Sequence, residues 1–157
     1  MLLRDAQGQL LSRATRTFDG KGRVSEERQT TENFAVFDEQ TFYTYDAQDR
    51  LIQMRSKTLF HSSEDTTRYN DHGDVSESHS VNRGPDLPPE GGFYDEENGV
   101  VKMDGEVLPI KILHEFQVSY IYHYDDYGNW TERTTSTSTG QKENLIESTQ
   151  YRKLTYY

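Results

Sequence analysis

The sequence predicts an all-β protein, built as one antiparallel sheet of successive β-hairpins with about 10–12 strands. A short turn pattern recurs five times along the 157 residues, and no window has the apolar spacing at i, i+3, i+4 and i+7 that is typical of a helix. Proline is absent from residues 1–84, as expected of strands whose backbone N–H groups donate to neighbours. We expect a strongly twisted and curved sheet that can be partly rolled.

The recurring pattern is an Asp or Asn followed three residues later by Gly or Asp. These residue types suit the first and last positions of a type I turn, because the first caps backbone N–H groups and the last tolerates positive φ. Asn70 can cap as Asp does, and Asp49 is one of the few non-Gly types that accept left-handed φ. The expected turn pairs are Asp5 and Gly8, Asp19 and Gly22, Asp46 and Asp49, Asn70 and Gly73, and Asp125 and Gly128.

Apolar and aromatic residues flank each turn at constant positions. An apolar residue stands two after the final turn position in every copy, and an aromatic residue precedes the Asp or Asn in four of the five. We expect the two flanking residues to form a cross-strand pair on the buried face. Because one hairpin cannot bury its own face, neighbouring hairpins must pair or stack to complete a core.

The sequence between the fourth and fifth turns has a different character. We expect a single repeat domain over residues 1–157, interrupted by an irregular loop or insertion at about residues 83–119, whose Pro- and Gly-rich part leaves the sheet. Asp104-Gly105 within it predicts a short hairpin. The tail from Glu147 to Tyr157 is expected to form a closing strand. The first copy has only Met1-Leu-Leu-Arg4 before its turn, which suggests a piece of something longer.

Composition excludes several classes of function. The chain carries 17 basic and 27 acidic residues, so its formal charge is 17 − 27 = −10, and nucleic acid is not an expected partner. No stretch approaches the roughly 18 apolar residues of a membrane-spanning helix. The absence of Cys excludes disulfides, thiolate zinc sites and a cysteine nucleophile.

Enzymatic chemistry is not expected. The paired carboxylates, such as Asp125-Asp126, already have turn-capping or solvating roles, and none stands in apolar sequence that would raise its pKa. No cofactor, catalytic residue or metal site is therefore predicted. Calcium binding by acidic turns and a zinc site made by distant His residues stay open as alternatives, since Asn70-Asp71 and Asp125-Asp126 offer several oxygen ligands.

The tandem pattern Tyr-Asp-x-x-Gly-Arg/Asn-Leu/Trp resembles the YD repeats of the RHS family, found in bacterial polymorphic toxins, Tc-toxin shells and animal teneurins. The resemblance covers most of the chain outside residues 83–119, and the Gly-Asn-Trp-Thr variant is similar to small bacterial YD-repeat proteins. It implies antiparallel hairpins joined into a long curving sheet, and a location in the cell envelope or outside the cell. The Asp-Pro-x-Gly motif of the self-cleaving end of RHS shells is missing.

Two functions follow from these observations. The first is a non-enzymatic structural or interaction module of an RHS-like protein, whose partners are neighbouring repeats or a second copy that pairs with exposed edge strands, as in a homodimer. The second is carbohydrate binding, in which aromatic rings on the sheet stack on sugars. The residues proposed for that platform are Tyr45, Tyr69, Tyr124 and Trp130. The competing interpretation of these rings is that they form the thin core.

Overall fold

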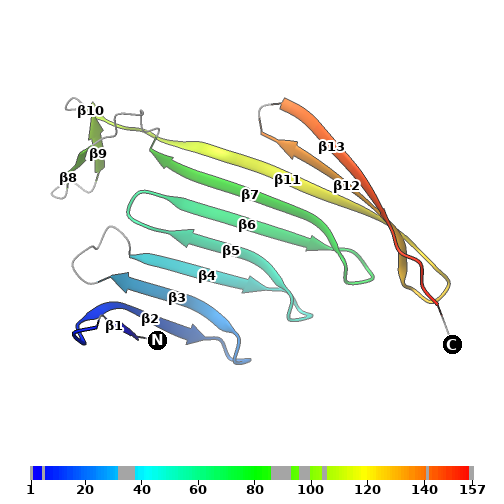
Figure 1. Ribbon diagram of the computed structural model, residues 1–157, viewed down its shortest axis with the longest axis horizontal. Helices are drawn as coiled ribbons and strands as arrows, with labels where there is room; N and C mark the ends of the chain where they lie inside the picture. Colours follow the sequence, from blue (N-terminus) through cyan, green and yellow to red (C-terminus); the bar gives the residue numbers. More distant parts are fainter. Residues whose placement is uncertain are drawn as a thin grey trace. The chain divides into compact units, whose positions relative to one another are not determined.

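The computed structural model describes residues 2–4, 6–31, 38–85, 93–95, 100–103, 106–140 and 142–155 (Figure 1). Within these ranges the regular structure consists entirely of β-strands, so the predicted all-β class is confirmed. By backbone contacts the chain divides into two units. Unit 1 comprises Met1–Glu64 and Asn82–Leu113, and unit 2 comprises Asp65–Val81 and His114–Tyr157.

Ten strands follow one another in one antiparallel sheet, in the order β1-β2-β3-β4-β5-β6-β7-β11-β12-β13. The strand order is open, with β1 and β13 as its terminal members (Figure 1). The ten strands are β1 (Leu2–Arg4), β2 (Leu10–Phe18), β3 (Val24–Thr31), β4 (Glu39–Tyr45), β5 (Leu51–Lys57), β6 (Ser62–Tyr69), β7 (Val75–Pro85), β11 (Ile110–Tyr124), β12 (Trp130–Thr139) and β13 (Lys142–Tyr151). This number agrees with the predicted range, while the predicted twist, curvature and rolling stay predictions.

A second, three-stranded sheet lies within the segment predicted to be an insertion. Its strands are β8 (Phe93–Asp95), β9 (Val100–Met103) and β10 (Glu106–Val107), in the order β10-β9-β8. Strands β9 and β10 pair antiparallel across residues 104–105, which confirms the predicted hairpin, although those two residues lie outside the described part. Residues 86–92 of the predicted loop also lie outside it.

The insertion ends earlier in the chain than the sequence predicts. Strand β11 begins at Ile110, so residues 110–119 belong to the ten-stranded sheet rather than to the expected insertion at about 83–119. The physical reason is that a turn motif locates only the strand end next to the turn, and it does not show how far the strand extends in the other direction. The far half of this 15-residue strand has no such marker beside it.

Each described hairpin register pairs the residue before the turn motif with the apolar residue after it. Phe18 pairs with Val24, Tyr45 with Leu51, and Tyr124 with Trp130. The predicted cross-strand pair is thus confirmed, but its burial is not general, because Phe18 is 57% exposed. The core is thin. Within residues 6–31, 38–83 and 107–140, Val81 is the one buried hydrophobic residue, with 5% of its surface exposed.

Candidate functional site

The turn that begins at Asp19 is held by four hydrogen bonds. The N–H of Gly22 donates to the Asp19 carbonyl oxygen at 2.9 Å, and the Asp19 N–H donates to the Arg23 carbonyl oxygen at 2.8 Å. The side-chain Oδ1 of Asp19 accepts two more bonds, from the N–H groups of Lys21 at 2.9 Å and Arg23 at 3.0 Å. The first residue of the motif therefore satisfies N–H groups that a tight turn would otherwise leave without a partner.

The same four bonds occur at three further turns, which makes the turn a true structural repeat. They join Asp46 with Gln48, Asp49 and Arg50, Asn70 with His72, Gly73 and Asp74, and Asp125 with Tyr127, Gly128 and Asn129. The first expected turn is described only in part, because Asp5 lies outside the described residues. There, Arg4 Nη1 donates to the Gly8 carbonyl oxygen at 2.8 Å.

The final position of all five turns has positive φ. The values are 83° at Gly8, 79° at Gly22, 65° at Asp49, 85° at Gly73 and 79° at Gly128. A Cβ in this region costs energy for most residue types, which explains why the motif ends in Gly or in a short polar residue. Asp49 is the one non-Gly residue with positive φ in the described part of the chain.

In the hairpins β1–β2, β2–β3, β4–β5 and β11–β12, each closed by a turn motif, a register shift follows the turn on the second strand. It falls beside Arg4, Phe18, Tyr45 and Tyr124, where two residues of one strand face one of its partner. Such bulges increase local twist and re-aim side chains. The turn motif thus fixes the register of the hairpin as well as its end.

In unit 1, neighbouring turns are joined by charge. Asp49 Oδ1 accepts hydrogen bonds from Lys21 Nζ at 2.6 Å and Arg23 Nη1 at 2.5 Å. Arg23 also donates through Nε to Asp19 Oδ2 at 2.7 Å, and its guanidinium lies 4.4 Å from the centre of the Tyr45 ring. Arg23 therefore contacts its own turn and the next one.

The pKa values of two turn carboxyls reflect these bonds. The Arg23 side chain, then its N–H, lowers the pKa of Asp19. At Asp46, loss of surrounding water acts to raise the pKa, but hydrogen bonds from the Arg50 N–H and guanidinium outweigh it, so the pKa of Asp46 is also lowered. Both carboxyls are thus held in the ionised form that caps the turn.

In unit 2, neighbouring turns are joined by aromatic rings. The Tyr124 hydroxyl donates to Asp74 Oδ2 at 2.7 Å and accepts from Asn70 Nδ2 at 2.7 Å. The His72 ring stacks on Tyr124 with centroids 3.8 Å apart. The Asn70 turn of one hairpin therefore contacts Tyr124, the tyrosine that precedes the turn of the next hairpin.

The aromatic group continues along β11 and β12. Tyr122 lies 5.9 Å from Tyr124 and 6.4 Å from Trp130, centroid to centroid, and its hydroxyl donates to the Val75 carbonyl oxygen at 2.9 Å. Arg152 lies 4.7 Å from the centre of the Trp130 ring. Burial raises the pKa values of Tyr122 and Tyr124, because a charged phenolate would lose its water.

The four residues of the predicted sugar platform do not form one group. Tyr45 belongs to unit 1, whereas Tyr69, Tyr124 and Trp130 belong to unit 2. All four side chains are half-buried. The hydroxyl of Tyr45 donates to the Val24 carbonyl oxygen at 2.9 Å. Tyr45 and Tyr124 thus each bond a neighbouring hairpin, whereas the Trp130 ring contacts Tyr122 of its own hairpin and Arg152 after β13.

The residues that make contacts between neighbouring turns were not identified from the sequence. Arg23, Asp74 and His72 occupy the variable positions of the motif, and Tyr122 lies two residues before its aromatic position. Arg at the position after the Gly or Asp in two copies, Arg23 and Arg50, was the available signal, because each donates back to the Asp of its own turn.

Neither a metal cluster nor a membrane helix occurs in the described ranges. No group of three His, Cys, Asp or Glu residues there could hold a metal ion. Within the same ranges, no helix is long and apolar enough to cross a membrane.

Comparison with known proteins yields a weak similarity to solved structures and no match to a family or a curated protein. No protein family matches the sequence, and no curated protein matches it. Among solved structures, the chain is similar to a chain in a structure of the Photorhabdus luminescens Tc holotoxin pore, with 14% identity and a TM-score of 0.25. The similarity covers 94% of this chain and 9% of that chain. A likeness of this size indicates no function.

Proposed function

We propose that this chain is a non-enzymatic structural and interaction module of the YD-repeat kind, a β-scaffold whose hairpins are joined side by side. The observation that carries the proposal is the repeated turn. Asp19, Asp46, Asn70 and Asp125 each accept the same pair of backbone N–H groups. A chain that repeats the same set of turn hydrogen bonds at fixed positions is typical of structural repeat proteins.

The Asp residues at the first position of the turn motif are poorly suited to acid–base catalysis. Asp19 and Asp46 have lowered pKa values, whereas a general acid near neutral pH needs a raised one. Their oxygens are already engaged by two backbone N–H groups and an arginine. A structural role accounts for both features.

The two terminal strands supply the proposed interaction surfaces. β1 and β13 lie at the ends of the strand order, and the exposed fractions of Leu2, Leu3 and Tyr151 are 55%, 54% and 78%. Edge strands pair readily with other strands unless charged residues protect them. We therefore propose that β1 and β13 pair with further repeats of the same kind or with a second copy, in the cell envelope or outside the cell.

Light scattering across a concentration series at about 0.15 M salt tests this proposal. We expect the mass of the chain to rise with concentration, and we expect Leu3→Lys combined with Tyr151→Lys to keep it monomeric, because a buried charge at an edge opposes strand pairing. Tyr127→Lys is the matched control, since Tyr127 is 76% exposed but lies in a turn. A strict monomer at every concentration contradicts self-association.

Carbohydrate binding is the competing proposal, and the aromatic group of unit 2 favours it. Tyr122, Tyr124 and Trp130 lie close enough to offer a stacking surface. Against it, His72 stacks on Tyr124 and Arg152 lies over Trp130, so one face of each of these rings is already in contact with another side chain.

A glycan array with the wild-type chain and Trp130→Ala discriminates between the scaffold and the sugar platform. Saturable binding that Trp130→Ala abolishes without unfolding supports the sugar platform, and an inert chain supports the scaffold.

A further inference from the structure

One face of β4 and β5 carries cations next to an aromatic ring. Phe42 pairs in register with Arg55, and Gln40 pairs with Lys57. Residues directly opposite each other on antiparallel strands project from the same face, and so do residues two apart on one strand. Phe42, Arg55 and Lys57 therefore share one face of the sheet.

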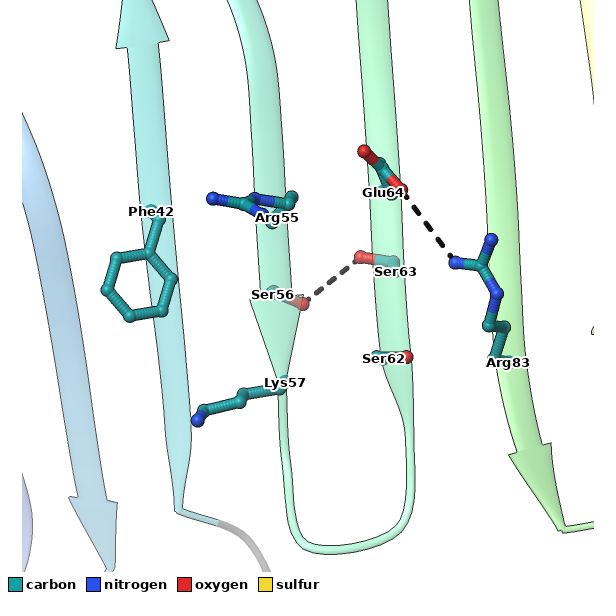
Figure 2. A pocket seen from close by; sticks show the side chains of 8 residues that line it. All are labelled: Phe42, Arg55, Ser56, Lys57, Ser62, Ser63, Glu64 and Arg83. Atoms are coloured by element: carbon teal, nitrogen blue, oxygen red, sulfur yellow. Dashed lines mark hydrogen bonds and ion pairs between the residues drawn. The ribbon is translucent and has the colours of Figure 1, made fainter. Parts of the chain in front are cut away.

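Strands β6 and β7 continue this face with an ion pair. Gln53, two residues before Arg55, donates through Nε2 to Glu64 Oε1 at 2.7 Å, which places Glu64 on the same face. Arg83 Nη1 lies 3.8 Å from Glu64 Oε2. Figure 2 shows Arg55 and Lys57 on β5, between Phe42 on β4 and the Glu64–Arg83 pair.

These side chains line a hollow of about 330 Å³. Ligand pockets for small molecules measure roughly 300–1,000 Å³, so the hollow can take more than a bare inorganic ion. The Ser62 hydroxyl adds a hydrogen-bonding group to its wall. All of its lining residues belong to unit 1.

The charge of the hollow is opposite to that of the whole chain. Among the lining residues, Arg55, Lys57 and Arg83 stand against one carboxylate, Glu64, so their balance is 3 − 1 = +2, whereas the chain carries −10. Glu26, which pairs with Phe42 on the same face, accepts a hydrogen bond from Gln40 at 2.6 Å. In the described ranges, neither the Arg55 guanidinium nor the Lys57 ammonium group makes a hydrogen bond or ion pair to another residue. Their charge is available to a ligand.

We propose that this hollow binds a phosphate or sulfate ester whose ring or apolar part rests against Phe42. A tetrahedral oxyanion offers at least three acceptor oxygens, which matches three cations better than the two oxygens of a carboxylate. Arg55 and Arg83 supply planar forks of donors, and Lys57 supplies a compact positive charge. Phe42 gives the site its preference for an ester over the free inorganic ion.

Isothermal titration calorimetry with phenyl phosphate, phenyl sulfate, benzoate and inorganic phosphate tests the proposal. We expect an ester to bind more tightly than benzoate or inorganic phosphate. Binding should weaken as salt is added, because Arg55 and Lys57 are exposed. A preference for phenyl phosphate assigns the site to phosphate esters, and a preference for phenyl sulfate assigns it to sulfate esters. Absence of saturable binding by either ester up to about 10 mM overturns the proposal.

Substitutions of opposite sign sharpen the test. Arg55→Gln combined with Lys57→Gln should weaken ester binding about tenfold or more, whereas Glu64→Gln should strengthen it, because it removes the one carboxylate and frees Arg83. Phe42→Ala should abolish the preference for the ester over inorganic phosphate. Circular dichroism verifies that each variant folds.

The matched control is Arg16→Gln. It removes one positive charge within unit 1, from an arginine paired with Glu27, and Glu27 pairs in register with Thr41, on the face opposite to Phe42. Ester binding by this variant should stay within about twofold of the wild type. If the Arg55 and Lys57 variant binds as the wild type does, the ligand is not held in this hollow.

Discussion

In unit 1 the Asp19 and Asp46 turns meet through charge, whereas in unit 2 the Asn70 and Asp125 hairpins meet through aromatic rings. Asp49 connects the first two turns through Lys21 and Arg23. In unit 2 the connection is made by the Tyr124 hydroxyl and the stacked His72 ring. The backbone hydrogen bonds of the turns are nevertheless the same.

This difference shows that the motif separates two tasks. Its first and last positions satisfy the backbone of the turn, and they tolerate little change because they must cap N–H groups and adopt positive φ. The residues at its variable positions determine whether ion pairs or aromatic contacts join one hairpin to the next. Exposed ion pairs are screened by salt and are worth little individually, so we expect the aromatic connection to be the stronger of the two.

The largest effect is expected from Trp130→Ala. Trp130 is half-buried and contacts Tyr122 and Arg152, so its truncation should lower the free energy of unfolding by about 2–3 kcal/mol, somewhat less than for a fully buried Trp. Phe18→Ala is the control, since Phe18 occupies a motif position but is 57% exposed, and it should cost less than about 1 kcal/mol. Urea unfolding followed by circular dichroism compares them. Equal losses would contradict the unequal packing of the two units.

Tyr124→Phe should have the next largest effect. It removes the hydroxyl that bonds Asp74 and Asn70 and should cost about 1–2 kcal/mol. Trp130 is the one Trp of the chain, so its fluorescence follows unfolding of unit 2 directly. Tyr151→Phe, at a side chain 78% exposed, should leave stability unchanged.

The same tyrosines predict a loss of stability in alkali. The folded pKa values of Tyr122 and Tyr124 are raised by burial above the ordinary value of 10.0, so the stabilisation is complete below pH 10.0 and is lost as pH rises through the folded values. Tyr43 in unit 1 has a raised pKa for the same reason. Stability of Tyr124→Phe should therefore depend less on pH above 10.0 than that of the wild type, measured by urea unfolding.

Acid should weaken the Asp19 and Asp46 turns of unit 1. The folded pKa values of Asp19 and Asp46 lie below the ordinary 3.8, so their contribution is complete above pH 3.8 and is lost as pH falls through the folded values. Asp19→Asn combined with Asp46→Asn should reduce this loss, because Asn caps the same N–H groups without titrating, as Asn70 does. Urea midpoints at about pH 7 and pH 3 measure it. An unchanged acid dependence would show that other carboxyls dominate.

The smallest effect is expected at Asp49. Asp49→Gly relieves the cost of a side chain at φ 65° but removes the ion pairs to Lys21 and Arg23, so stability should change little while its dependence on salt decreases. Asp49→Ala loses the ion pairs and keeps the strain, and should be less stable than Asp49→Gly by about 1 kcal/mol. Thermal unfolding at low and high salt separates the two contributions. Equal stability of the two variants would show that the strain is negligible.

The turns were predictable because their information is local. An Asp caps N–H groups two and four residues ahead, and a Gly adopts positive φ three residues ahead, so the bonds of Asp125 and the φ of Gly128 follow from a stretch of five residues. Asp49 was identified as a turn residue in the same way. Its ion pairs to a turn 26 and 28 residues earlier were not predictable, because no local rule relates those positions.

By itself, the sequence determined the all-β class, the position of the turns and the cross-strand pairs that flank them, because period-2 patterning and turn chemistry act over a few residues. The tertiary structure decided which variable positions touch across neighbouring hairpins, where β11 begins and that residues 93–107 include a separate sheet. It also decided that Arg55, Lys57 and Arg83 line one hollow. The physical reason is that strand order and register set these contacts. The sequence of one strand does not show which residues of another strand will lie beside it on the same face of the sheet.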